Sequence, residues 1–368
     1  MRILLAPDKF AGTLSAPEAA RAIAEGWVRT APSEEFAIAP MSDGGPGFVD
    51  VLATTWDLGP DVVTVTGPLG TAVPAHLLMA GDTAWIESAQ ACGLHLGEKD
   101  PWRATTRGVG ELVAAAVDAG ARRVVIGLGG SATIDGGAGF LAALGATADA
   151  DLDRGPEGLR SVTSVDLSAA RGRVAGVELV AAADVDVPLL GMFGAVKMFG
   201  PQKGLSEEDI LAVDRVLDRF VVAACGSAPA QRRVADAPGA GAAGGLGLAV
   251  SLLGGVHRSG LDLVADAIGL PDRVAACDLV ITGEGAFDYS SRAGKVVHGV
   301  AQRAMAAAVP CIVLAGRVDV GAREMRALGV ESAYAMTDVV GEAAALSAPA
   351  RHLADLAERV ARSWTSGT

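Results

Sequence analysis

The sequence predicts an α/β protein of two domains, with both chain ends in one doubly wound parallel sheet and the middle inserted as a second α/β domain. Strand, loop and helix patterns alternate through about the first 60 residues. A hairpin signal, Gly81-Asp82-Thr83, then interrupts the alternation. The alternation resumes from Asp278. We therefore expect domains at residues 1–62 plus 278–368 and at residues 63–277.

The first domain begins with two predicted strands that each end in a polar turn. Residues 3–6 form a short apolar strand ended by Pro7-Asp8, and a helix follows with Ser15 and Glu18 as its capping box. A second strand at residues 36–40 leads into Ser42-Asp43-Gly44-Gly45 and a helix that begins near Pro46. Strand–loop–helix units of this kind predict a parallel sheet.

The middle of the chain mixes hairpin and parallel signals. Strands are predicted at residues 62–66, 75–80, 84–88, 124–127 and 178–183, and helices at residues 106–118 and from Ser206 onward. The run 237–257 carries no formal charge, but seven glycines and Pro238 make it a poor membrane span. A buried glycine loop followed by a core helix is the better interpretation.

The C-terminal part returns to the first pattern. Strands are expected at residues 279–282, 310–314 and 332–336, with helices at 295–307 and 323–328. His298 falls inside a helix and is expected to pack rather than to act in catalysis. The last helix is expected to start at Ser347 as its N-cap, with an apolar stripe of Leu353, Leu356, Val360 and Trp364.

Residues 124–141, VVIGLGGSATIDGGAGFL, are the most informative stretch, because a buried strand runs into a glycine-rich loop before a helix. Glycines allow positive φ angles and close backbone approach, and free N–H groups there favour an anion such as phosphate. A plain glycine-rich turn is the alternative. The spacing is not the dinucleotide fingerprint, since Ala132 stands where its third glycine belongs, and the chain contains no P-loop motif.

The amino-acid composition limits the classes of ligand that the protein is expected to bind. The net charge of −13 argues against nucleic acid and anionic membranes, so an anionic substrate needs local cations, backbone N–H groups or a metal ion. The four cysteines are far apart in apolar settings, which indicates reduced thiols and a cytoplasmic protein without a zinc site. The N-terminus has no signal-peptide pattern.

Polar residues collect where the predicted strands end, which is where open α/β sheets bind ligands. They are Asp8 and Lys9, Ser42 and Asp43, Ser131 and Asp135, Asp184 and Asp186, and Glu284 and Asp288. Lys203, Arg292, Lys295 and Arg317 add positive charge. Carboxylates, lysines and glycine loops suit phosphoryl transfer, in which cations hold phosphates and carboxylates hold Mg²⁺. Taken singly, each residue is explained as well by a turn or a solvated charge.

The ordered motifs resemble the class I glycerate kinases over nearly the whole chain. The matching segments include Ser42-Asp43-Gly44-Gly45, GLGGSATIDGGAG, Ala183-Asp184-Val185, Phe199-Gly200-Pro201-Gln202-Lys203-Gly204, Val280-Ile281-Thr282-Gly283-Glu284-Gly285 and Gly294-Lys295. The resemblance implies a Rossmann-like domain built from both chain ends, an inserted mixed α/β domain and an active site in the cleft between them. It also implies ATP with Mg²⁺ and D-glycerate, with 2-phosphoglycerate favoured over 3-phosphoglycerate, and leaves a homodimer open.

The resemblance also implies roles for particular residues. Asp184, Lys203 and Lys295 are expected to be catalytic, with Asp184 orienting the hydroxyl, and Asp184, Glu284 and Asp288 are expected around Mg²⁺. Substrate or phosphate is expected at Asp8, Lys9, Ser42, Asp43, Gly44, Gly45, Gly129, Gly130, Ser131, Asp135, Gly136, Gly137, Gln202, Glu284 and Gly285.

Several positions depart from the family pattern. Ala11, Pro46 and Tyr289-Ser290-Ser291 replace the residues usual in the family, and the charge of Lys9 is expected to compensate for Ala11. Ile134 and Val187 stand where asparagine is usual, so an apolar side chain is expected where a polar one would face the site. These two residues motivate two alternatives: a kinase for another small hydroxy acid, or an inactive protein that binds nucleotide or carboxylate.

Overall fold

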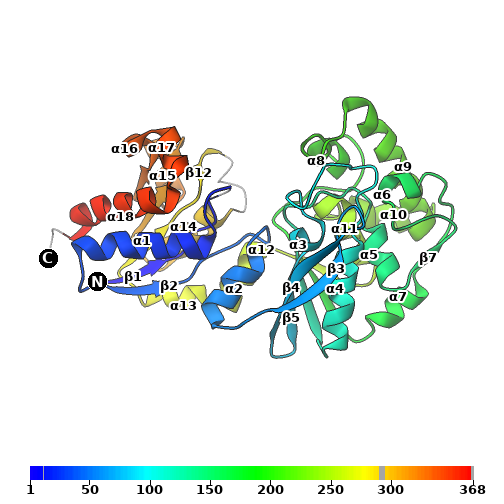
Figure 1. Cartoon of the computed structure of the whole chain (residues 1–368), viewed down its shortest axis with the longest axis horizontal. Coiled ribbons are helices and arrows are strands. Elements are labelled where there is room, and N and C mark those ends of the chain that lie inside the picture. Colours follow the sequence, from blue (N-terminus) through cyan, green and yellow to red (C-terminus); the bar gives the residue numbers. More distant parts are fainter. Residues whose placement is uncertain (11, 290–294, 366–368) are drawn as a thin grey trace. The chain divides into compact units, whose positions relative to one another are not determined.

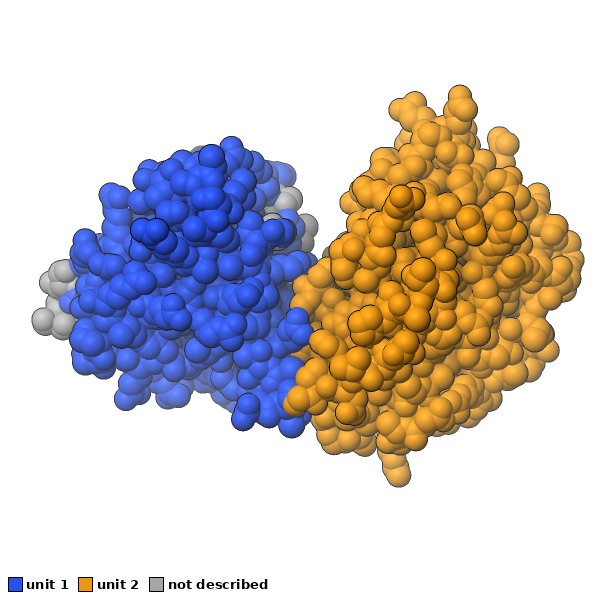
Figure 2. Space-filling view, viewed as in Figure 1, with its two compact units in different colours: residues 1–43, 50–58, 261–368 blue, residues 44–49, 59–260 orange. Residues whose placement is uncertain are grey.

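The chain divides into two compact units in a computed structural model that describes residues 1–10, 12–289 and 295–365. Unit 1 comprises Met1–Asp43, Asp50–Leu58 and Leu261–Thr368, and unit 2 comprises Gly44–Val49 and Gly59–Gly260. Figure 2 colours them separately. Both ends of the chain thus contribute to unit 1, and the middle of the chain forms unit 2, as the interrupted strand–helix alternation indicates.

Unit 1 is built on a five-stranded sheet in which every neighbouring pair is parallel. The order is β15 (Ser332–Ala335), β13 (Cys311–Ala315), β11 (Leu279–Thr282), β1 (Arg2–Leu5) and β2 (Glu35–Ile38). Numbered along unit 1, this is the doubly wound order 2-1-3-4-5, whose direction of winding reverses between β1 and β11. The short strands β12 (Ala286–Phe287) and β14 (Arg317–Val318) pair beside it.

Helices cover this sheet, and the first and last of them pack together (Figure 1). A Cβ on Gly26 of α1 would lie 1.9 Å from the Ala354 carbonyl oxygen of α18, so glycine permits the close crossing. The helices are α1 (Ala16–Thr30), α2 (Phe48–Trp56), α12 (Gly260–Ala267), α13 (Leu270–Ala275), α14 (Val296–Ala306), α15 (Ala322–Ala327), α16 (Thr337–Val340), α17 (Glu342–Ser347) and α18 (Pro349–Thr365).

Capping signals in the sequence predict the start of the first helix correctly and the start of the last helix incorrectly. The predicted capping box of α1 is confirmed, since the Ser15 N–H donates to Glu18 Oε2 at 2.8 Å and the Glu18 N–H donates to Ser15 Oγ at 3.4 Å. The predicted cap at Ser347 is wrong. Ser347 is the last residue of α17 and donates to the Ala344 carbonyl at 2.9 Å. Pro349 starts α18 instead, because its fixed φ suits the first helical turn.

Unit 2 contains a six-stranded mixed sheet. Its order is β10 (Val256–Arg258), β9 (Glu178–Ala182), β6 (Arg123–Gly127), β5 (Thr83–Glu87), β4 (Ala72–Ala80) and β3 (Asp61–Thr66). The predicted hairpin is confirmed, because β4 and β5 are antiparallel, with Ala80 opposite Thr83 across the turn. Within this sheet β5, β6, β9 and β10 run parallel to one another.

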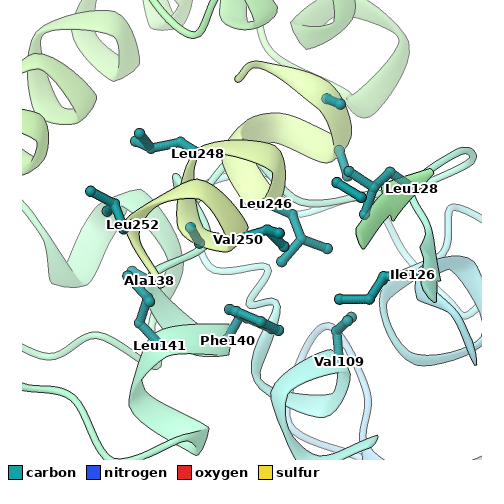
Figure 3. Close-up of a cluster of buried hydrophobic side chains, with 14 of the residues drawn as sticks. Val109, Ile126, Leu128, Ala138, Phe140, Leu141, Leu246, Leu248, Val250 and Leu252 are labelled. Carbon is teal, nitrogen blue, oxygen red and sulfur yellow. The ribbon is translucent and has the colours of Figure 1, made fainter. Parts of the chain in front are cut away.

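Most of the helices of unit 2 enclose one apolar core. Side chains from α4, β6, α5 and α11 point toward one another in it (Figure 3). The remaining elements are α3 (Ser88–Cys92), α4 (Arg107–Asp118), α5 (Ala138–Ala143), β7 (Thr147–Ala148), α6 (Gly155–Gly158), β8 (Val165–Asp166), α7 (Ser168–Arg173), α8 (Ala195–Lys203), α9 (Glu207–Cys225), α10 (Pro229–Asp236), the 3₁₀ turn η1 (Ala242–Gly245) and α11 (Leu246–Leu252).

Two compositional expectations are also met. The uncharged run contains the buried turn η1 and the core helix α11, and among the described residues no helix is both long and apolar enough to cross a bilayer. All four cysteines are free thiols, three of them buried and Cys225 half-buried. This agrees with the wide separation of the four cysteines in the sequence.

Candidate active site

Unit 1 holds a cavity of about 440 Å³ at the carboxyl ends of its parallel strands. Asp8 and Lys9 follow β1, Asp43 follows β2, and Glu284 and Gly285 follow β11 in its lining. The buried side chains of Asp8 and Glu284 flank the position where the winding of the sheet reverses. Ligands of doubly wound sheets bind at this position, so the fold itself singles out these two carboxylates.

Asp8, Lys9 and Asp43 form a charged group at one end of this lining. The Lys9 Nζ lies 3.7 Å from Asp8 Oδ1 and 3.6 Å from Asp43 Oδ1, and the Lys9 N–H donates to Asp8 Oδ1 at 2.7 Å. Burial raises the pKa of Asp8 to about 6, with Lys9 opposing the rise and Asp43 adding to it. The predicted grouping of these three residues is therefore present, and the Asp8 carboxyl titrates close to neutral pH.

The segment after β11 supplies the rest of the charged lining. Glu284 is 7% exposed, and its carbonyl accepts the N–H of Gly316 at 3.1 Å, while Gly285 accepts that of Arg317 at 3.1 Å. Asp288 and Lys295 also line the cavity, and Lys295 is the N-cap residue of α14. The sequence predictions for Ala11, Ser290, Ser291, Arg292 and Gly294 lie outside the described residues.

In unit 2, the glycine-rich loop packs against the segment Gly44–Val49. The Gly129 N–H donates to the Gly44 carbonyl at 3.0 Å, and a Cβ on Gly129 would lie 2.5 Å from Gly45 Cα. A Cβ on Gly130, which has a φ of +80°, would lie 2.7 Å from Pro46 Cγ. Close packing against Gly45 and Pro46 therefore accounts for these two glycines without a ligand.

Asp135 organises the same loop from the inside. Its side chain is fully buried and accepts hydrogen bonds from the Thr106 N–H and Oγ1, at 2.9 and 2.7 Å, and from the N–H groups of Gly137 and Gly139, at 3.0 and 3.2 Å. Burial raises the pKa of Asp135, and these hydrogen bonds oppose the rise. Through these hydrogen bonds the Asp135 carboxylate holds the loop and the start of α5 in one conformation.

Lys203 is the buried cation of unit 2. Its Nζ donates to Ser131 Oγ at 3.0 Å and to the Thr133 carbonyl at 2.7 Å, and its side chain is 3% exposed. Burial lowers the pKa of Lys203 to about 8, against the opposing influence of Cys92 and Asp135. Lys203 and Ser131 are thus brought together, whereas Gln202 on the same helix is exposed.

The carboxylates expected around Mg²⁺ are divided between the units. Asp184 follows β9 in unit 2 and is partly buried, while Glu284 and Asp288 belong to unit 1. In residues 1–10, 12–289 and 295–365, no group of three or more His, Cys, Asp or Glu side chains is placed to hold a metal ion. Mg²⁺ needs fewer protein ligands, since it is commonly held by one or two carboxylates together with substrate phosphates.

Ile134 and Val187 require a correction. Their side chains are 1% and 9% exposed and belong to the hydrophobic core of unit 2. The expectation that they put apolar groups where polar ones would face the site is wrong, because both side chains turn into the core. These substitutions therefore give no reason to infer an altered substrate.

Glu87 is a buried acidic residue that the sequence analysis missed. It is 3% exposed at the end of β5, and its Oε2 accepts the Gly47 N–H at 2.9 Å just before α2. It was counted within a predicted strand at residues 84–88, where alternation gives no sign of a role. The sequence signal that could have identified Glu87 is the position of a carboxylate at the end of a buried strand. Thr337 and Glu342, in the cavity of unit 1, were also missed.

The chain is thus an α/β protein with carboxylates and lysines at the switch point of a doubly wound sheet in unit 1 and a glycine-rich loop in unit 2. The model of the glycerate kinase family matches residues 3–365. The chain belongs to the glycerate kinase family, and it is a kinase.

Individual relatives agree with this assignment. A glycerate kinase from Bacillus subtilis is 40% identical, over 98% of this chain and 96% of the relative. A glycerate 2-kinase from Escherichia coli is 39% identical, over 93% of this chain and 92% of the relative. A crystal structure assigned to glycerate kinase 2 from Salmonella typhimurium LT2 has a TM-score of 0.82 and 35% identity, covering 100% of this chain and 99% of that chain.

Proposed function

We propose that this kinase transfers a phosphoryl group from ATP, with Mg²⁺, to a hydroxyl of D-glycerate and forms 2-phosphoglycerate. The observation that carries the proposal is the cavity of unit 1, where carboxylates and lysines line the switch point of the sheet. Relatives named glycerate kinase and glycerate 2-kinase support the acceptor and the product. The free thiols support a cytoplasmic location.

The donor set in the cavity fits a magnesium–phosphate complex. Glu284 and Asp288 offer oxygen ligands, and Lys9 and Lys295 offer positive charge on the same lining. Bound Mg²⁺ would neutralise phosphate charge that develops during transfer. The acidic lining alone would repel a polyphosphate, so the two lysines and the carboxylates are expected to act as one set.

Each unit is assigned its own residue roles in the proposed reaction. Lys295 and Lys9 hold phosphate oxygens and stabilise their charge, which is the main requirement of phosphoryl transfer. Asp184 orients the acceptor hydroxyl and takes up its proton. Lys203 holds Ser131 and the Thr133 carbonyl in place, so that the glycine-rich loop keeps a fixed shape.

Release of ADP with D-glycerate tests this proposal directly. Purified protein is assayed with ATP and Mg²⁺, and the phosphorylated position is read from the phosphorus NMR spectrum of the product. Lys295→Ala and Asp184→Asn are each expected to lower kcat by at least about a hundredfold. Turnover no greater than that of these two variants would sink the proposal, and a 3-phosphoglycerate product would correct the position.

The alternative acceptors are tested in the same assay. Another small hydroxy acid was suggested by Ile134 and Val187, but both side chains lie in the core. We therefore expect D-glycerate to have the highest kcat/KM in a panel of small hydroxy acids. Ile134→Asn serves as a probe here, and it is expected to destabilise unit 2 by burying an amide rather than to change the preferred acid.

A further inference from the structure

The cavity of unit 1 runs along the whole carboxyl edge of the sheet. Its lining includes residues that follow each of the five strands, from Met336 after β15 to Asp43 after β2. Neighbouring strands lie roughly 4.8 Å apart, so four intervals span about 19 Å. A three-carbon acid would occupy only a small part of such a length.

The chemistry of the lining changes along this edge. At the β15 end, Met336 and Ala345 are buried apolar residues, and Leu346 on α17 is 60% exposed. Toward β11, β1 and β2 the lining becomes charged, with Lys295, Lys9 and the four carboxylates of Asp8, Asp43, Glu284 and Asp288. One end therefore suits an apolar group and the other a polyanion with its cation.

Polar groups accompany the apolar end. Thr337 and Glu342 line it, and within the described part of the chain neither side chain has a hydrogen-bond partner. A nucleoside presents a flat base and ribose hydroxyls, and a glutamate accepts hydrogen bonds from such hydroxyls. Arg317 also lines the cavity, on the short strand β14 that follows β13, and β13 lies between β15 and β11 in the order of the main sheet.

We propose that this cavity is the nucleotide site, with the base against Leu346, Met336 and Ala345, the ribose near Thr337 and Glu342, and the phosphates over β11 and β1. The inference rests on the proposed function for the choice of ATP as donor. The volume of about 440 Å³ falls within the usual range for drug-sized ligands, roughly 300–1,000 Å³. The apolar end of the cavity favours a nucleotide as the occupant over the acceptor acid alone, because the acid has no apolar group to place there.

Titration of the full-length protein with Mg-ADP and with Mg-pyrophosphate tests the division into two ends. Leu346→Asp is expected to weaken Mg-ADP at least about tenfold, because a charge then faces the base. Pyrophosphate has no nucleoside, so its affinity is expected to change less than twofold. Leu211→Asp is the matched control, since Leu211 is a 64% exposed leucine on α9 of unit 2. Its affinities should equal those of the wild type.

Steady-state kinetics and a second variant complete the test. Leu346→Asp should raise the KM for ATP and leave that for D-glycerate unchanged, and Glu342→Gln should reduce the preference for ADP over 2′,3′-dideoxy-ADP. Equal losses for ADP and pyrophosphate, or a rise in the KM for glycerate alone, would overturn the inference. A protein that shows the expected ADP pattern but no turnover of glycerate would contradict only the proposed function.

Discussion

Lys203 carries a positive charge into the interior of unit 2, and its titration should be visible in the stability of the protein. Its pKa is lowered by burial to about 8, from 10.5. Between about pH 8 and 10.5 the unfolded chain therefore binds more protons at this residue than the folded protein does. The free energy of unfolding contributed by Lys203 must rise with pH across that window.

Lys203→Met should abolish this rise. Relative to the variant, the wild type is expected to gain stability between pH 7 and pH 10, by an amount on the order of 2–3 kcal/mol. Urea unfolding at both pH values measures the difference, and Lys197→Met, on the same helix but at an exposed position, is the control. An equal pH dependence in wild type and Lys203→Met would show that the buried amine does not titrate in this range.

Asp8 has the opposite linkage. Its pKa of about 6 in the folded protein lies above the ordinary value of 3.8, so the folded state binds more protons between about pH 4 and 6. Stability contributed by this residue therefore falls as pH rises through that window. The ionised form of Asp8, which pairs with the Lys9 ammonium group, is therefore destabilised by its burial in the fold.

Asp8→Asn should separate these two effects. At pH 7.5 the variant is expected to unfold with a free energy about 1–3 kcal/mol higher than the wild type, yet with a greatly reduced kcat/KM. The wild-type kcat/KM should rise toward a plateau with a midpoint near pH 6, and the variant should lack this limb. A limb of the same midpoint in Asp8→Asn would assign it to another group.

At the scale of elements, the loop between β6 and α5 depends on glycine for two separable reasons. Gly137 has a φ of +78°, and a Cβ there would also lie 2.4 Å from the Ala249 Cβ of α11. Gly120, at the end of α4, has a φ of +90° with nothing within 4 Å of its Cβ position. Both glycines therefore have a positive φ, but only Gly137 is packed so closely that a Cβ would meet a neighbouring helix.

Alanine substitutions measure the packing component. Gly120→Ala should lower the free energy of unfolding by about 1–2 kcal/mol, the cost of a left-handed residue. Gly137→Ala should cost roughly a further 1–3 kcal/mol, because α5 and α11 must separate. Chemical denaturation of the two variants provides the comparison. Equal losses in the free energy of unfolding would mean that α5 and α11 can move apart at no cost in stability.

The prediction of elements from sequence succeeds where the signal is local. The capping box of α1 and the β4–β5 hairpin are encoded within a few residues of each feature, and both are confirmed. The start of α18 was misplaced because a serine and a proline competed for it, and only packing of the helix decides between such signals. Glu87 was missed because its partner, Gly47, is 40 residues away in the chain.

At the scale of the molecule, the winding of strands and helices indicated which stretches of the chain associate, but not which way side chains turn. The strand-end residues Asp8, Asp43 and Glu284 could be predicted to meet, since parallel strands bring their carboxyl ends to one edge. Ile134 lies in a loop without periodicity, where the sequence does not distinguish a side chain facing the site from one in the core. Burial of Lys203 likewise depends on the fold of the whole unit.

The division into units predicts how the chain behaves when cut. A fragment of residues 44–260 contains all six strands of the unit 2 sheet and its core. It is expected to unfold cooperatively on heating, as followed by circular dichroism. A fragment of residues 261–368 lacks β1 and β2 and is expected to remain unfolded. A cooperative transition in the second fragment alone would contradict the assignment of β1 to the centre of the sheet.

The position of β1 has a consequence for synthesis of the protein. β1 is synthesised before the other described strands, yet one of its two neighbours, β11, begins at Leu279. Until then the β11-facing edge of β1 has no native strand to pair with, whereas the 59–260 stretch can already collapse. At this stage the nascent chain should therefore have a folded 59–260 stretch, while β1 is not yet paired with β11 and the C-terminal part is still being synthesised. Chaperones that shield exposed strand edges would be most useful to this protein during that interval.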